Sequence, residues 1–324
     1  MKVRLAAAQP LNARTRAIAR CRGNAVKRNE HFLKYNIGAS TYDEAYVREY
    51  GEEYLTYLDG FVRRAADRTA DLLLLPEFAF VPGVLASSGP TIPPNPRAFA
   101  DAVRLYTWSA RRFQEWLGGW TRKTGMYGAA ALLTARGGRL HNTGIVMDPK
   151  GRLAGRYDKI HMPEDELVHF SPGRDSTIIP TPLGRVAFSI CYDVQFPEHH
   201  ACLALRGAQI VLHPSGGYTL PDETWDMGRN RLRVRASDHY CALVYSCFAP
   251  SGPWMPAESC VIAPNGRVVA EVRGEKAGMA IGDVEIGAKR SWPGDGEKAP
   301  DREQIRRRLR RPDTYAPLSS RRRK

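Results

Sequence analysis

The chain has 324 residues, of which 43% are hydrophobic and 25% are charged, and its formal net charge at pH 7 is +14. These proportions are close to those of globular proteins, so they exclude a disordered chain and allow one large domain with a sizeable core. No run of eighteen apolar residues occurs, and the first residues turn polar before a signal-peptide core could form, so we expect neither a membrane span nor export.

Short apolar runs alternate with amphipathic stretches along the chain, which is typical of an α/β fold in which helices cover a sheet. Several runs are apolar throughout, as expected of strands that are buried on both faces. Turn residues at Asp148–Gly151 and Pro264–Gly266 predict hairpins. The predicted strands are Val3–Ala8, Asp71–Leu75, Met126–Thr134, Thr143–Asp148, Arg185–Ile190, Gln209–His213, Ala242–Phe248, Cys260–Ala263 and Arg267–Val272.

Apolar residues recur with helical spacing across Val47–Ala65 and Phe99–Leu117, which predicts two long amphipathic helices. A third helix is expected over Pro197–Gly207, because proline suits the first turn of a helix and glycine often ends one. The stretch Ser87–Pro96 contains four prolines and predicts an irregular surface loop.

Half of the positive charge lies at the end of the chain. Between Asp301 and Lys324 there are ten Arg or Lys residues and three acids, a net charge of +7. A charge run of this kind is usually a solvated tail, although a weak contact with a polyanion or another subunit is the alternative. No nucleic-acid-binding motif accompanies it, so we expect a domain over residues 1–300, a basic tail over residues 301–324, and no nucleic-acid partner.

The six cysteines are sparse and include no Cys-x-x-Cys pair, which fits a reducing compartment and predicts a cytoplasmic protein. Cys191 ends the apolar strand RVAFSI shortly before the helix at Pro197, and strand, turn and helix around a nucleophile is a recurring arrangement. A thiolate is the reactive form, and cationic or helix-end surroundings favour it. The alternative is a buried core cysteine. We assign that alternative to Cys202, Cys241, Cys247 and Cys260.

Two charged residues also follow apolar strands. Glu77 comes after DLLLLP, at the carboxyl end of a strand, where α/β sheets build ligand sites. Lys159 ends another strand and precedes a charged loop. By position alone, each could equally be a solvated charge at a strand end. No histidine shows the spacing of a Cys/His protease or of a metal ligand, so we expect no metal site.

Three motifs, taken in order, resemble the Glu, Lys and Cys triad of the nitrilase superfamily of carbon-nitrogen hydrolases. They are LLLLPE with Glu77, YDKIHMP with Lys159 and CYDVQFPE with Cys191. The resemblance covers most of the chain, because AAAQP, HNTGIVMDPKGRLAGRYDKIH, FSPG, LALRGAQIVLHPS and SCVIAPNGRVVAEV also have counterparts there in the same order. It implies a four-layer α-β-β-α sandwich, assembly into a homo-oligomer, and no metal or organic cofactor.

The resemblance also implies a role for each residue of the triad. Glu77 would be the general base, Lys159 would stabilise the tetrahedral intermediate, and Cys191 would be the nucleophile that forms a thioester. The family has an additional active-site glutamate before the Pro-Gly turn, and Glu166 stands six residues before Pro172. An acidic run on a solvated loop is the alternative for Glu166.

Some segments depart from the family pattern. Leu11–Asp59 is longer than usual, and Met162-Pro163-Glu164-Asp165 stands where the family often has phenylalanine and aspartate. Relatives that act on nitriles commonly place Trp-Glu after the cysteine, whereas this chain has Tyr192-Asp193, which favours an amide substrate. Val194-Gln195 lacks the arginine or histidine that would hold the carboxylate of an N-carbamoyl amino acid.

We therefore expect hydrolysis of a linear carboxamide or N-carbamoyl amine, with release of ammonia. A nitrilase, an acyltransferase that passes the thioester to an amine, and a non-catalytic basic binding protein are the alternatives. The aromatic candidates for the substrate pocket are Phe78, Tyr192, Phe196, Tyr218, Trp225 and Trp254.

Overall fold

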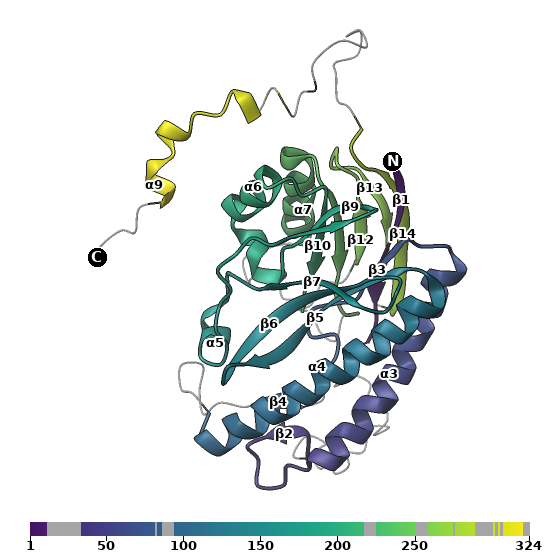
Figure 1. The fold of residues 1–324 in the computed structure, drawn as a ribbon, viewed down its shortest axis with the longest axis vertical. Helices are drawn as coiled ribbons and strands as arrows, with labels where there is room; N and C mark the ends of the chain where they lie inside the picture. The colour runs from purple at the N-terminus through teal and green to yellow at the C-terminus, as the bar shows by residue number, and fades with distance from the viewer. Residues whose placement is uncertain are drawn as a thin grey trace. The chain divides into compact units, whose positions relative to one another are not determined.

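The computed structural model describes residues 1–11, 34–81, 83–85, 94–216, 225–249, 258–274, 276–288, 301, 304 and 307–319. The chain divides into two units, Lys2–Ile286 and Gly287–Lys324 with Met1. The larger unit contains two six-stranded sheets and a two-stranded one (Figure 1). The smaller unit includes η2 (Pro312–Thr314) and α9 (Ala316–Ser319). The division at residue 300 into domain and tail stays a prediction.

The first sheet has the order β14-β1-β3-β5-β6-β7. Its three central strands are parallel and the other strands are antiparallel to their neighbours. Glu77 follows one parallel strand and Lys159 follows the edge strand, so both lie beyond strand ends. The strands are β1 (Lys2–Gln9), β3 (Leu72–Leu74), β5 (Tyr127–Arg136), β6 (Arg139–Met147), β7 (Leu153–Asp158) and β14 (Gly278–Glu285).

The second sheet has the order β13-β12-β11-β10-β9-β8, and β9, β10 and β11 are parallel. Its strands are β8 (Ile178–Thr181), β9 (Gly184–Phe188), β10 (Ile210–Pro214), β11 (Ala242–Ser246), β12 (Cys260–Ile262) and β13 (Val268–Glu271). The predicted hairpins join β6 to β7 and β12 to β13. A short parallel pair, β2 (Asn36–Ile37) and β4 (Val84–Leu85), lies outside these sheets.

Alternate residues of a strand face opposite layers, because side chains along a strand repeat with a period of two. In β1, Val3, Leu5 and Ala7 belong to the core between the two sheets, together with residues of β9, β10 and β11. The intervening Ala6 and Ala8 pack against the helices α3 and α4. This explains why Leu5–Ala8 is a continuous apolar run.

Helices cover the outer face of each sheet. α3 (Glu44–Asp67) and α4 (Pro96–Thr124) run side by side over the first sheet (Figure 1). α6 (Pro197–Leu205) and α7 (Trp225–His239) cover the second, where Leu203 packs near Val211 and Leu232 near Leu243. The predicted four-layer α-β-β-α sandwich is confirmed. None of the helices in the described ranges is both long and apolar enough to cross a membrane.

The two predicted long helices are present, and both extend beyond the predicted ranges at each end. The Asp43 side chain caps α3 by accepting a hydrogen bond from the Tyr46 amide, and Asn95 caps α4 in the same way through Ala98. Gly125 ends α4 in a left-handed conformation with φ of +72°. The predicted loop Ser87–Pro96 is described only at residues 94–96, and Pro96 belongs to α4 instead of the loop; residues 87–93 lie outside the described ranges.

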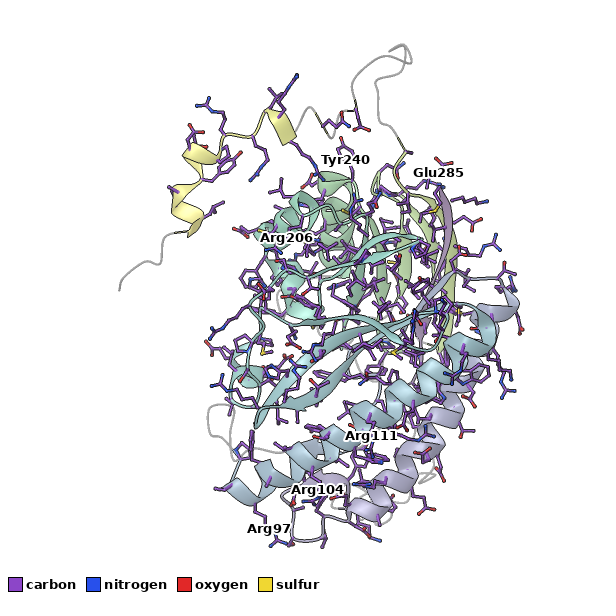
Figure 2. The ribbon with its side chains drawn as sticks, viewed as in Figure 1. Arg97, Arg104, Arg111, Arg206, Tyr240 and Glu285 are labelled. Atoms are coloured by element: carbon purple, nitrogen blue, oxygen red, sulfur yellow. The ribbon has the colours of Figure 1, made fainter. Side chains whose placement is uncertain are left out.

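Part of the basic charge of the body lies on α4. Arg97, Arg104 and Arg111 are seven residues apart and exposed, and they project from the helix away from the sheet (Figure 2). Arg104 pairs with Glu44 of α3 at 2.9 Å between Nε and Oε2, so this charge links the two helices.

The sequence missed β2, β4, β8 and β14 and placed the start of β6 too late. The first half of β6, RLHNT, is largely polar and gives no apolar signal, because Asn142 and Thr143 make buried polar contacts there. β14 carries glycines at Gly278 and Gly282, which weaken its strand signal.

Candidate active site

Glu77 lies just beyond β3, and its side chain is only 1% exposed. Its Oε1 accepts hydrogen bonds from Asn142 Nδ2 at 2.7 Å and from Lys159 Nζ at 2.9 Å. Its Oε2 accepts one from the Gly216 amide at 2.7 Å. The carboxylate is therefore held in a fixed orientation by donors from three separate segments.

Lys159 follows β7 and is fully buried. Its ammonium donates to Glu77 Oε1 and also to Glu166, whose Oε1 and Oε2 lie 2.8 and 2.9 Å from Nζ. Glu166 belongs to the short helix α5 (Glu164–Leu167). The structure thus brings the three charged residues named by the sequence into one cluster, with a buried cation between two carboxylates.

Cys191 follows β9 and begins the 3₁₀ helix η1 (Cys191–Gln195). Its φ is +45°, a conformation that non-glycine residues rarely adopt. Phe78, directly after Glu77, has a φ of +56°. Such strained residues cluster at functional sites, where the surrounding structure holds them in place. Ser215, one residue before the amide that binds Glu77, lowers the pKa of the Cys191 thiol.

Asp193 connects the turn at Cys191 to the loop after Lys159. Its Oδ2 accepts hydrogen bonds from the Ile190 amide at 2.9 Å and the Tyr157 hydroxyl at 2.8 Å. Its Oδ1 accepts from the His161 amide at 2.9 Å and pairs with His161 Nδ1 at 2.9 Å. Because Asp193 is fully buried, these contacts fix the nucleophile turn relative to the lysine.

The FSPG turn closes the loop that carries Glu166. The Gly173 amide donates to the Lys159 carbonyl at 2.8 Å. A Cβ at Gly173 would lie 2.1 Å from the Asp158 carbonyl oxygen, so no side chain fits there. Glu166 is therefore on a segment whose two ends are tied together beside Lys159.

The charges and the burial of this cluster shift its pKa values. Burial lowers the pKa of Lys159, but the charges of Glu77 and Glu166 raise it above its usual value, so the ammonium stays protonated. Burial and then the charge of Glu77 raise the pKa of Glu166 to about 7, against the effect of Lys159.

The Cys191 thiol is neutral at rest. Burial and then Glu77 raise its pKa to about 12, and Lys159 and the Ser215 hydrogen bond only partly offset them. The cationic surroundings expected from the sequence therefore do not produce a resting thiolate. Glu77 is the carboxylate held by both Lys159 and the amide that follows Ser215.

One group of side chains in the described ranges offers a metal-like set of ligands. Atoms of His161, Asp193 and His199 lie within 4.8 Å of one another. The Asp193 oxygens already have two hydrogen-bonding partners each, and His199 Nε2 pairs with the Phe188 carbonyl at 3.2 Å. A metal ion would have to displace these partners, so the group is better suited to positioning Cys191.

The aromatic candidates differ in what they contact. Phe196 stacks on His161 with 3.9 Å between ring centroids, and the Tyr192 ring meets the Phe196 edge at 5.6 Å. Phe78 packs with the cluster that includes Tyr35 and Ile37. The Trp225 side chain, Tyr218 and Trp254 lie outside the described part of the chain.

Sequence reasoning missed Asn142, Ser215 and Gly216. Asn142 lies within β6, in HNT, whereas Ser215 and Gly216 follow β10, in HPSG. Glu77 was identified because it follows an apolar strand. The same criterion would have identified Ser215, which directly follows β10.

The chain is similar to known carbon-nitrogen hydrolases. A model of the carbon-nitrogen hydrolase family matches residues 44–293. A hydrolase of Schizosaccharomyces pombe is 30% identical over 180 residues, which are 50% of this chain and 53% of that protein. The omega-amidase of Saccharomyces cerevisiae is 27% identical over 206 residues, 59% of this chain and 67% of that protein. The first of these matches thus spans only about half the length of the relative.

Solved structures show the same fold. A double mutant of the amidase from Nesterenkonia sp. AN1, in complex with acrylamide, has a TM-score of 0.66 at 21% identity, covering 98% of this chain and 97% of that chain.

Proposed function

The chain belongs to the carbon-nitrogen hydrolase family, in the amidase-like branch of the nitrilase superfamily, and we propose that it hydrolyses a small linear carboxamide or N-carbamoyl amine with release of ammonia. One observation carries the proposal. A fully buried lysine is clamped between Glu77 and Glu166, next to a strained cysteine with a neutral thiol. This arrangement provides a nucleophile, a base and a fixed cation in one place.

In the first step, Glu77 takes the thiol proton as the sulfur of Cys191 attacks the amide carbon. The carbonyl π electrons move to oxygen, and the ammonium of Lys159 stabilises the resulting oxyanion. The backbone N–H groups at the start of η1 can add a further donor, because the first N–H groups of a helix have no partner within it.

In the second step, Glu77 returns the proton to the nitrogen, the C–N bond breaks, and ammonia leaves a thioester on Cys191. A water molecule then attacks the thioester while Glu77 accepts its proton. Collapse of the second tetrahedral intermediate releases the carboxylic acid, and the thiolate regains its proton from Glu77. The base and the nucleophile thus return to their starting states without any external reactant other than water.

The substrate class rests on Tyr192-Asp193 after the nucleophile and on relatives named amidases. The two oxygens of Asp193 accept four hydrogen bonds within the protein, so this carboxylate is not available to bind a charged group of the substrate. The aromatic rings of Phe196 and Tyr192 lie beside Cys191 in the sequence and favour an uncharged substrate.

The test is an ammonia-release screen over linear amides, ureas and nitriles with the wild type, Cys191→Ala and Glu77→Gln. We expect release from amides or N-carbamoyl amines by the wild type alone, and a covalent mass increase on Cys191 when the reaction is quenched with acid. Release that persists in Cys191→Ala would refute the proposal. Turnover of nitriles in preference to amides, or product formation only when an amine acceptor is added, would replace it with a nitrilase or an acyltransferase. The homo-oligomeric state and the cytoplasmic location stay predictions.

A further inference from the structure

The structure holds the two oxygens of Glu77 differently. Oε1 accepts two hydrogen bonds, from Asn142 Nδ2 at 2.7 Å and Lys159 Nζ at 2.9 Å. Oε2 accepts one, from the Gly216 amide at 2.7 Å. A carboxylate oxygen has about two lone-pair sites, so Oε1 is fully occupied while Oε2 keeps one site available.

Oε2 is bound by the segment that also acts on the Cys191 thiol. The donor to Oε2 is the amide of Gly216, and the residue before it, Ser215, lowers the pKa of that thiol. Lys159, on Oε1, is the group that the oxyanion requires, and its ammonium already donates to Glu166 as well. Oε2 is thus the oxygen left for the proton, whereas the lysine that would stabilise the oxyanion is bound to Oε1.

We propose that Asn142 is a positioning residue that occupies Oε1 of Glu77, so that Oε2 is the oxygen that takes the proton from Cys191. This rests on the amide hydrolysis proposed above. Asn142 is fully buried, and its backbone carbonyl accepts the Lys159 amide at 2.9 Å, so one residue orients both the base and the strand end that carries the lysine.

A purely structural asparagine would be expected to have both ends of its carboxamide paired. Among the described residues, Asn142 Oδ1 is buried and has no hydrogen-bonding partner. A buried acceptor without a partner costs free energy, so the side chain keeps its contact with Glu77 at the expense of its own carbonyl. This is the pattern expected of a residue that serves the site rather than the fold.

The decisive variant is Asn142→Asp, which keeps the shape and loses the donor. At pH 8 the introduced carboxylate cannot donate to Glu77, and kcat should fall by about 10- to 100-fold, the scale of one hydrogen bond to a charged group, with little change in KM. At lower pH the introduced carboxyl becomes protonated and can donate again. The ratio of variant to wild-type kcat should therefore rise as the pH is lowered towards about 5.

Thr143→Val is the matched control. Thr143 is the next residue on β6, is 1% exposed, and makes its polar contacts with Thr134 and Asp158 instead of with Glu77. It should lose thermal stability without any change in the pH dependence of kcat. A second measurement is the rate at which iodoacetamide alkylates Cys191, which should fall in Asn142→Ala because proton removal is slower.

The outcomes separate this inference from the proposed function. If the wild type releases no ammonia from any amide, the proposed function fails, but alkylation of Cys191 still tests Asn142. If the wild type is active and Asn142→Asp keeps a constant ratio to it at all pH values, or Asn142→Ala is alkylated at the wild-type rate, Asn142 is only a structural residue and the inference is overturned.

Discussion

Replacing Glu166 with Gln should lower activity and raise stability together. Glu166 keeps both oxygens within 2.9 Å of the Lys159 ammonium, and the substitution preserves its size while it removes one oxygen acceptor and the charge. Under the proposed mechanism, kcat/KM should fall by about 10²-fold or more, the scale at which a positioned acid-base group contributes. Replacing Glu164 or Asp165, its neighbours in the same short helix, should have a much smaller effect.

The effect on stability follows from the pKa of Glu166, which burial raises from 4.5 to about 7. Because the folded-state pKa is above the unfolded one, the folded protein holds this proton more tightly between pH 4.5 and 7. Glu166 therefore makes the protein less stable as the pH rises through that window, and the loss is complete above pH 7. A shift of this size corresponds to on the order of 3 kcal/mol.

The Gln variant cannot lose this proton, so at pH 8 it should unfold at a higher temperature than the wild type, and the difference should shrink at pH 4.5. Thermal unfolding at several pH values, together with ammonia release, measures both effects. If Glu166→Gln keeps near-wild-type kcat/KM while Glu77→Gln is inactive, the second carboxylate lies elsewhere and the alignment through the FSPG turn is wrong. A variant that is less stable at every pH would contradict the pKa argument.

Three further predictions concern other parts of the chain. Iodoacetamide should inactivate the enzyme by modifying Cys191, and substrate should protect it. Cys202 is exposed, so its assignment to the buried core from the sequence was wrong, and its modification should leave activity intact; inactivation that follows Cys202 in mass mapping would contradict the assignment of Cys191. Deleting Ser319–Lys324 should leave kcat on a small neutral substrate unchanged, and a large loss would place the tail in the site or in the assembly. Dialysis against EDTA should leave kcat unchanged, since the groups around Cys191 pair with one another, and activity that returns only with added metal would show that the His161, Asp193 and His199 group holds an ion.

The sequence predicts the layers of the fold well because burial on both faces leaves a strong signal. Strands such as β1 and β10 contain runs of apolar residues, since each lies between a sheet and a layer of helices. This apolar pattern is absent where a strand carries polar residues that contact the site. The first half of β6 contains Asn142, which donates a hydrogen bond to Glu77. The polar residues there weaken the sequence pattern of a strand.

The cluster of Glu77, Lys159 and Glu166 could be named from motifs, but its geometry could not. Glu166 lies on a short helix whose sequence, EDEL, also suits a solvated acidic loop. Its position depends on Gly173 closing against the Asp158 carbonyl, a contact between backbones that composition does not reveal. The donors at Asn142 and Gly216 come from other strands, so only the assembled sheets bring them to one carboxylate.

Under the proposed mechanism, a neutral thiol requires a separate base, which is the carboxylate of Glu77. Departure of ammonia requires a proton on nitrogen, and the proton taken from Cys191 is the one that Glu77 can return. A cysteine that was already ionised at rest would have lost that proton before the substrate bound. Here burial keeps the proton on sulfur at rest, with a pKa of about 12, and Lys159 keeps its charge for the oxyanion. If so, Glu77→Gln should remove both attack and ammonia release, and neither a stronger amine nucleophile nor a higher pH below about 9 should restore turnover of the amide.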